Sequence, residues 1–264
     1  MKKTKIDWAD STWNPVTGCL NDCKYCYARG ISRRYCMAGW KAAEVGGLHD
    51  LKSPVWHPTY QYGLQSGYSI DSYPHGFDPT FHRTRLKYPQ QWWKKPRNIF
   101  VCSMADLFGA WVPDEWIVDV FAACAAAPWH NYLFLTKNPA RYMDLAHKGI
   151  LPSENNFWFG STATKDDDLF WWGDDYNIFA SIEPLLGRFD CTGEPEKKLD
   201  WVIIGAESGR RKGKVVPERA WIEEICDAAD QAGVPVFMKD SLVPIMGEEH
   251  MRREFPAGLG KDSI

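Results

Sequence analysis

Three cysteines fall within eight residues near the start of the chain, in the stretch GCLNDCKYCYA (18–28). Cys19, Cys23 and Cys26 have the spacing C-x3-C-x2-C. Thiolates are ligands of zinc and of iron–sulfur clusters, and a [4Fe–4S] cluster held wholly by protein takes four of them. Three local thiolates therefore leave one iron with an open position, where a small molecule can bind.

Two simpler interpretations of the cysteines remain open. A structural zinc site needs a fourth ligand and favours paired C-x2-4-C knuckles. No histidine follows Cys26 at ligand spacing, since the next one is His49. Packing alone is the other alternative, but the polar Asn21, Asp22 and Lys24 lie between the cysteines and argue against a core position for all three.

The composition is that of an ordinary globular protein. The 264 residues are 45% hydrophobic and 25% charged, with a formal net charge of −3, unlike the strongly basic bulk of many nucleic-acid binders. The N-terminal stretch lacks an apolar signal region, and no run approaches ~18 apolar residues, so we expect no membrane span and no membrane partner. We expect a cytoplasmic protein, in which clustered cysteines bind metal or act in catalysis rather than form disulfides.

Short apolar runs alternate with amphipathic segments along most of the chain. The runs predict buried parallel strands at 98–104, 131–137, 156–162, 177–183, 200–208 and 234–240, with a weaker candidate at 11–18. Helical periodicity appears at 112–127 and 216–233. The alternation predicts a single α/β domain over 1–264, a partial (β/α)6-7 TIM-like barrel, with an open doubly wound sheet as the alternative. Residues 36–80 interrupt the rhythm, and we expect an insertion that covers the barrel mouth.

The cysteine motif, with the aromatic Tyr25 directly before its last cysteine, resembles that of the radical S-adenosylmethionine (SAM) superfamily. The resemblance implies that Cys19, Cys23 and Cys26 bind a [4Fe–4S] cluster, that SAM binds the open iron, and that the partial barrel is of the radical SAM type. It also implies reductive cleavage of SAM to a 5′-deoxyadenosyl radical, which abstracts hydrogen from a substrate. An electron donor such as flavodoxin or ferredoxin would supply the electron.

Five further segments together resemble a phage-associated family of radical SAM proteins that carry the three-cysteine motif and mostly have no assigned reaction. They are FHRTRLKYPQQWWKKPRNIFVCSMADLFG, YLFLTKNPARYMDL, FASIEPLLG, DWVIIGAESG and AGVPVFMKD. Two stretches depart from the family pattern. This chain has GAESG (205–209) where the family has GGESG, and KDSL (239–242) where the family commonly has KQWG. A phage gene would place the protein in the cytoplasm of the host cell.

Polar residues at the ends of the predicted strands are the remaining site candidates, because parallel α/β barrels form their active sites there. By resemblance, Tyr25 should lie beside the adenine of SAM, and Ser103 and Asp106 near its amino group. Further candidates for cofactor binding are Ser161, Thr162, Glu183 and Glu207. Lys137 and Lys239 are candidates for substrate binding, and a Glu–Lys ion pair across the barrel mouth is the structural alternative. Cys102 lies within a predicted strand and could face the lumen.

Two basic segments suggest a nucleic acid or nucleotide as substrate. HRTRLKYPQQWWKKPR (82–97) interleaves cations with aromatic residues, and SGRRKGK (208–214) places Arg210 and Arg211 after the strand end at Glu207. A solvated helix is the alternative for the first segment. We expect modification or rearrangement (isomerisation) of a DNA base, in the polymer or as a nucleotide. The alternatives are a radical SAM enzyme acting on a protein or small metabolite, and a non-catalytic zinc or Fe–S module.

Overall fold

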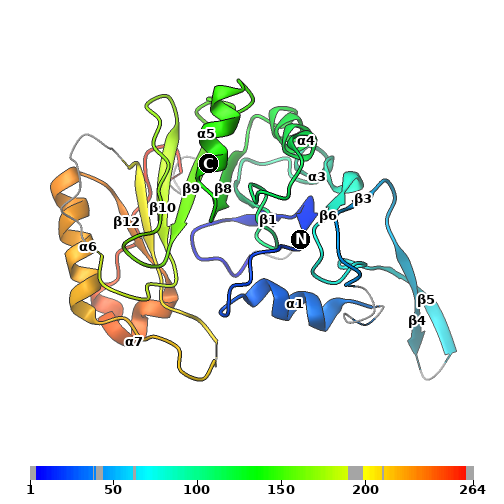
Figure 1. Ribbon diagram of the computed structural model, residues 1–264, viewed down its shortest axis with the longest axis horizontal. Helices are drawn as coiled ribbons and strands as arrows, with labels where there is room; N and C mark the ends of the chain where they lie inside the picture. Colours follow the sequence, from blue (N-terminus) through cyan, green and yellow to red (C-terminus); the bar gives the residue numbers. More distant parts are fainter. Residues whose placement is uncertain are drawn as a thin grey trace.

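The computed structural model describes residues 4–37, 39, 44–61, 64–189, 199–209 and 211–259. Seven parallel strands form its central sheet, in the order β1-β7-β8-β9-β10-β11-β12 (Figure 1). The strands are β1 (Ser11–Trp13), β7 (Asn98–Val101), β8 (Asn131–Thr136), β9 (Phe157–Ala163), β10 (Asn177–Ile182), β11 (Trp201–Ile204) and β12 (Val236–Met238). The sheet curls into a half barrel, which confirms the predicted α/β partial barrel.

The outer face of the sheet is covered by helices that follow the strands in sequence. They are α4 (Asp114–Ala125), α5 (Ala140–His147) and α6 (Arg219–Ala232), with the short α3 (Tyr88–Trp92) and α7 (Val243–Met246). Ala180 and Ile182 of β10 pack in one core with Ile222 and Ile225 of α6. The apolar stripe of α6 recurs every three to four residues and ends at Gly233, whose φ of +66° suits a residue without a side chain. Among the described residues, no helix is long and apolar enough to cross a bilayer.

The inner face is filled near the start of the strands and open near their ends. Trp8, Phe100, Phe179 and Trp201 belong to a separate core cluster with Leu133, Trp158, Ile203, Phe237 and Leu259. Phe179 alternates with Ala180 of the outer core along β10, as side chains do in any strand. Because the aromatic residues close one end of the half barrel, the open volume lies at the carboxyl ends of the strands.

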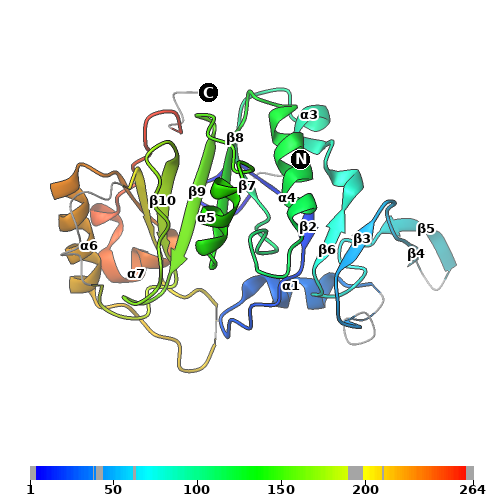
Figure 2. The same ribbon diagram turned by 45° about the horizontal axis from the view of Figure 1, so that its top comes forward.

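Residues 36–80 contain regular structure rather than one long loop. β3 (His49–Leu51) joins β2 (Val16–Thr17) and β6 (Thr80–His82) in a three-stranded sheet. β4 (Trp56–Gln61) and β5 (Leu64–Ile70) pair with each other as an antiparallel hairpin. Figures 1 and 2 show that this hairpin extends away from the seven-stranded sheet rather than over its strand ends. The described part of the segment that reaches the strand ends is the turn before β6, described below.

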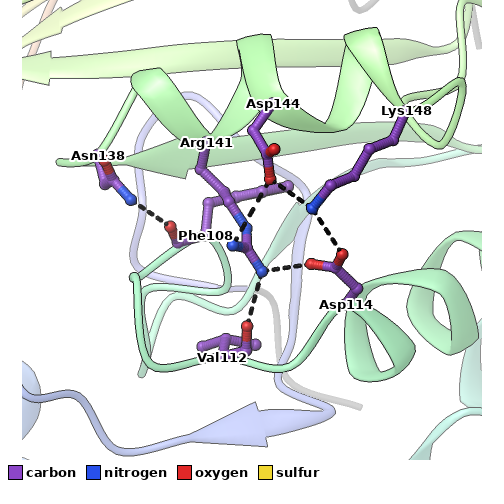
Figure 3. Close-up of polar contacts among 7 residues, drawn as sticks. All are labelled: Phe108, Val112, Asp114, Asn138, Arg141, Asp144 and Lys148. Carbon is purple, nitrogen blue, oxygen red and sulfur yellow. Dashed lines mark hydrogen bonds and ion pairs between the residues drawn. The ribbon is translucent and has the colours of Figure 1, made fainter.

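A network of polar contacts holds the loop between β7 and α4 against α5 (Figure 3). Arg141 donates to the carbonyl of Val112 at 2.9 Å and pairs with Asp114 at 2.5 Å. Asn138 donates through Nδ2 to the carbonyl of Phe108 at 3.0 Å. The loop carries Asp106, so these contacts position a predicted site residue. The remaining short helices are η1 (Arg83–Arg85), η2 (Asp240–Leu242) and η3 (Glu248–His250).

Candidate functional site

A pocket of about 220 Å³ opens at the carboxyl ends of the strands. Its wall combines the cysteine loop with polar side chains that follow five different strands. Of the predicted site residues it brings together Cys19, Cys23, Tyr25, Cys26, Ser103, Asp106, Lys137, Thr162, Glu183, Glu207 and Lys239. Cys102 is also among the lining residues, but it packs in the core cluster that contains Ile117 and Cys124 of α4.

Two backbone hydrogen bonds fix the start of the cysteine loop, one to the loop after β7 and one to the turn before β6. Gly18 donates its N–H to the carbonyl of Met104 at 2.9 Å, and Cys19 donates its N–H to the carbonyl of Phe77 at 3.1 Å. Gly18 has φ +84°, and a Cβ there would lie 2.2 Å from the backbone oxygen of Asp78. Only glycine fits both this conformation and this close approach. The loop therefore starts from a fixed point beside the strand ends.

Helix α1 (Tyr27–Tyr35) begins directly after the motif. Cys26 is its N-cap, and the Sγ of Cys26 accepts a hydrogen bond from the N–H of Arg29 at 3.4 Å. The Sγ of Cys19 likewise accepts from the N–H of Asn21 at 3.4 Å. Backbone N–H groups thus already point at two of the three sulfurs, as they would toward thiolates.

The environment of the thiols is partly desolvated. Burial, reinforced by the nearby Asp106 carboxylate, raises the pKa of Cys19 to about 12. Burial also raises the pKa of Cys23, while the ammonium of Lys137 opposes that rise. Within the described part of the chain, no group of three or more His, Cys, Asp or Glu side chains is already gathered in a metal-binding arrangement. The three thiols nevertheless share one pocket, so the donor set has the chemistry of a thiolate-held cluster.

Asp106 acts as a structural anchor between the cysteine loop and β8. Its Oδ1 accepts hydrogen bonds from Thr136 Oγ1 at 2.7 Å and from the N–H of Phe108 at 3.2 Å. Its Oδ2 accepts from the N–H of Lys137 at 3.0 Å and from Asn21 Nδ2 at 3.1 Å. Burial raises the pKa of Asp106, and these bonds oppose the rise. Both oxygens already have protein partners, so the expected contact with a SAM amino group stays a prediction.

Glu183 and Lys239 form an ion pair inside the pocket, with 2.5 Å between Oε1 and Nζ. This is the Glu–Lys pair across the mouth that the sequence left open as a structural alternative. A Cβ at Gly205 would lie 3.1 Å from Lys239 Cδ and 3.2 Å from Glu183 Cδ, so the glycine leaves room for the pair. Lys137 lies with its Nζ 5.4 Å from the centre of the Tyr25 ring, a cation–π contact.

Three predicted residues do not line the pocket or cannot be placed: Arg211, Arg210 and Ser161. Glu207 pairs with Arg211 at 2.6 Å, and this guanidinium lowers the pKa of Glu207. Arg210 lies outside the described residues. Ser161 lies on the outer face of β9, where its Oγ accepts a hydrogen bond from the N–H of Trp171 at 3.2 Å. Ser161 is not among the residues that line the pocket, unlike its neighbour Thr162.

Four polar residues line the pocket without having been predicted: Asn21, Tyr27, Thr136 and Ser181. Tyr27 donates its hydroxyl to the carbonyl of Ser103 at 2.7 Å, while Ser103 Oγ lies 3.2 Å from Asn14 Oδ1. Ser181 had a usable signal, because it precedes Glu183 by two residues and so shares its face of the strand. Thr136 ends β8 directly before the predicted Lys137, so the strand-end rule could have selected it as well. Asn21 and Tyr27 lie in the cysteine loop and at the start of α1, where no such signal was available.

The basic segment 82–97 lies outside the pocket, and its arginines serve the fold. Arg83 pairs with Asp50 and Asp119, each at 2.7 Å. Arg85 donates to the carbonyl of Asn14 at 2.9 Å. Arg97 donates to Ser11 Oγ, and the rings of Tyr88 and Trp92 stack on each other at 3.6 Å between centres. Much of the expected cation and aromatic surface is therefore engaged internally.

Comparisons with known proteins give a family and one distant structural likeness. No curated protein matches the sequence at a significant level. The solved structure of a mutant spore photoproduct lyase is similar at a TM-score of 0.41 and 12% identity, over 90% of this chain and 81% of that one. A likeness this distant assigns neither activity nor site residues. The family model described as "Protein of unknown function (DUF5131)" matches residues 3–249, and the chain belongs to this family.

Proposed function

We propose that the chain is a radical SAM enzyme that modifies or rearranges a DNA base or a nucleotide. The proposal rests on one observation, which is that two groups of functional side chains meet in one pocket. The three thiols of the C-x3-C-x2-C motif line the same pocket as the strand-end charges Lys137, Glu183 and Lys239. A structural zinc clip would need the thiols but would not need charged groups opposite them at the open end of a half barrel.

In this proposal Cys19, Cys23 and Cys26 hold a [4Fe–4S] cluster. When bound, the cluster would supply the electron that cleaves SAM reductively and so yields the 5′-deoxyadenosyl radical. The backbone N–H groups of Asn21 and Arg29 already lie 3.4 Å from two of the sulfurs and would stabilise their thiolate form. Asp106 ties the loop to β8 through Asn21 and so keeps the motif at the strand ends.

The charged side chains of the pocket suit the two ends of SAM. An ammonium such as that of Lys137 or Lys239 would receive a carboxylate, and Glu183 would accept hydrogen bonds from ribose hydroxyls or from an amino group. When the ligand binds, the Glu183–Lys239 ion pair would either break or persist while each side chain also contacts the ligand. The side chains of Glu183 and Lys239 are 27% and 18% exposed, so breaking the pair does not leave a fully buried charge without a partner.

The nucleic-acid part of the proposal rests on the loop after Glu207. Lys212 and Lys214 are exposed there, four and six residues after Ser208, which lines the pocket. Cations at the rim of a pocket attract phosphate, and the base beside that phosphate would enter the pocket. A pyrimidine that carries a side chain is our first choice for the base. A protein or small-metabolite substrate remains the alternative, and it would not need these lysines.

The enzyme class is tested by anaerobic reconstitution with iron and sulfide, followed by SAM and dithionite. We expect about four irons per chain and formation of 5′-deoxyadenosine. Cys23→Ala should abolish both. Cys226→Ala is the matched control, because Cys226 packs on α6 outside the pocket and should leave iron content unchanged. One bound zinc and no 5′-deoxyadenosine would sink the enzyme proposal and favour a non-catalytic module.

The substrate is tested by adding DNA, nucleotides or peptides to the same assay. DNA or a nucleotide should raise the rate of 5′-deoxyadenosine formation and should appear with altered mass. Stimulation by peptides alone would keep the enzyme class and reject the nucleic-acid substrate. Flavodoxin or ferredoxin can replace dithionite in a second series to identify the physiological type of electron donor.

A further inference from the structure

The floor of the pocket carries a buried hydroxyl group without a partner. Ser181 on β10 is only 1% exposed and lines the pocket, yet its Oγ makes no hydrogen bond. Among the residues that the structure describes, it is the only hydroxyl in this situation. Burying a hydroxyl without a hydrogen bond is unfavourable, so a bound molecule that supplies the partner would remove a real cost.

Strand geometry directs Ser181 toward the inside of the half barrel. Side chains alternate along β10, so Ser181 shares its face with Phe179, which lies in the inner core, and with Glu183, which lies in the pocket. Ala180 and Ile182 on the other face pack against α6. Ser181 therefore lies one step deeper than the Glu183–Lys239 pair, between the charged rim and the aromatic core.

Trp8 provides a second unmatched polar atom at the same floor. Its side chain is 2% exposed and lines the pocket, and its Nε1 has no hydrogen-bond partner. The ring is held in place by Phe100 and Phe179, with centres 4.7 and 6.2 Å away. An indole N–H only donates, whereas a hydroxyl donates or accepts. The two groups together suit a ligand atom that accepts hydrogen bonds.

We propose that Ser181 Oγ and Trp8 Nε1 form a polar subsite at the pocket floor that binds a neutral hydrogen-bond acceptor, such as a carbonyl oxygen or a ring nitrogen. The group is neutral because the other floor residues Ile6, Phe100 and Leu135 are apolar, and burial of a charge among them would be costly. The subsite rests on the proposed function only for the source of the group. That source is either the adenosyl part of SAM or the base of the second substrate.

The first experiment measures thermal stability without added ligand. Ser181→Ala removes a hydroxyl that has no partner, so its melting temperature should equal or exceed that of the wild type. Ser161→Ala is the matched control: Ser161 is equally buried at 1%, but its Oγ accepts a hydrogen bond outside the pocket. We expect Ser161→Ala to lower the melting temperature by about 2–4 °C. An equal drop for Ser181→Ala would overturn the proposal, because the hydroxyl would already be satisfied in the folded protein.

The second experiment measures binding by equilibrium dialysis under anaerobic conditions. SAM probes the first source, and uracil added to the SAM-loaded protein probes the second. Ser181→Ala should weaken one of them by about 5–10-fold, the effect of one lost hydrogen bond, and Ser161→Ala should weaken neither. A loss for SAM assigns the subsite to the cofactor, and a loss for uracil assigns it to the substrate base. Unchanged affinity for both would overturn the proposal.

Trp8→Phe removes the indole N–H and keeps an aromatic ring in place. It should weaken the same probe as Ser181→Ala does. Trp158→Phe is its control, because Trp158 Nε1 is also buried without a partner but Trp158 does not line the pocket. Equal losses for both tryptophan variants would exclude Trp8 from the subsite. Binding is measured separately from 5′-deoxyadenosine formation, so a subsite can stand even if the proposed reaction fails.

Discussion

The pocket rim and the basic segment 82–97 are both rich in charged side chains, but these side chains have different surroundings. At the rim, Lys137, Glu183 and Lys239 border an open cavity. In the basic segment, Arg83, Arg85 and Arg97 contact carboxylates, a carbonyl and a hydroxyl of the protein itself. The difference teaches that charge content alone does not locate a binding surface. The place of a residue at the end of a parallel strand is the better guide.

The largest expected effect comes from the anchor of the cysteine loop. Gly18→Ala should lower the free energy of unfolding by about 3 kcal/mol, because it combines a positive φ with a clash against backbone. Gly30→Ala is the control: Gly30 lies in α1, and no atom lies within 4 Å of the position that an added methyl group would take. It should stabilise the fold by roughly 0.5–1 kcal/mol. Urea unfolding measures both, and equal behaviour of the two variants would contradict a strained anchor.

Two aspartates sharpen the comparison between the regions. Asp106→Ala leaves four hydrogen-bond donors without their acceptor and should cost about 3 kcal/mol of unfolding free energy. Asp119→Ala removes one of the two partners of Arg83 at an exposed site and should cost only about 0.5 kcal/mol. Urea midpoints and iron content after reconstitution report the outcome. Equal costs would show that the basic segment is as tightly built as the pocket rim.

Nucleic-acid binding should follow the loop after Glu207 rather than the basic segment. Replacing Lys212 and Lys214 together by Ser should weaken DNA binding and make the salt dependence, log K against log[salt], shallower by about 1–2 units of slope. Replacing Lys94 and Lys95 by Ser gives a matched loss of two cations and should leave the slope unchanged. Fluorescence anisotropy over a salt series measures both. The reverse result would move the proposed interface to the basic segment.

The smallest effect concerns the pair of Glu207 and Arg211. The guanidinium lowers the pKa of Glu207 below its ordinary value of 4.5, so the pair stabilises the fold above that pH. The stabilisation is lost as the pH falls through the lowered pKa, because the carboxyl group becomes protonated. Arg211→Met should therefore lower the urea midpoint slightly at pH 7 and leave it unchanged at the acid end. A stability difference that persists below the lowered pKa would require another role for Arg211.

The sequence alone located the main strands along the chain, favoured the partial barrel and contained the cysteine motif. Local patterns carry this information: apolar runs for the strands 131–137 and 177–183, and the spacing of Cys19, Cys23 and Cys26. The strand-end rule then selected Lys137, Thr162, Glu183 and Lys239, all of which line the pocket. These successes share a physical reason, because each depends on residues close together in the chain.

Only the tertiary structure decided which neighbours face the pocket and which charges are already engaged. The strands are apolar on both faces, so their sequence does not show which of the neighbours Ser161 and Thr162 faces the pocket, and the structure places only Thr162 there. Arg83 meets Asp50 and Asp119, which lie 33 and 36 residues away along the chain. Such contacts arise from the packing of distant elements, and no local pattern encodes them. The motif and the fold class can thus be predicted from local sequence patterns, whereas the shape of the pocket depends on contacts between distant parts of the chain.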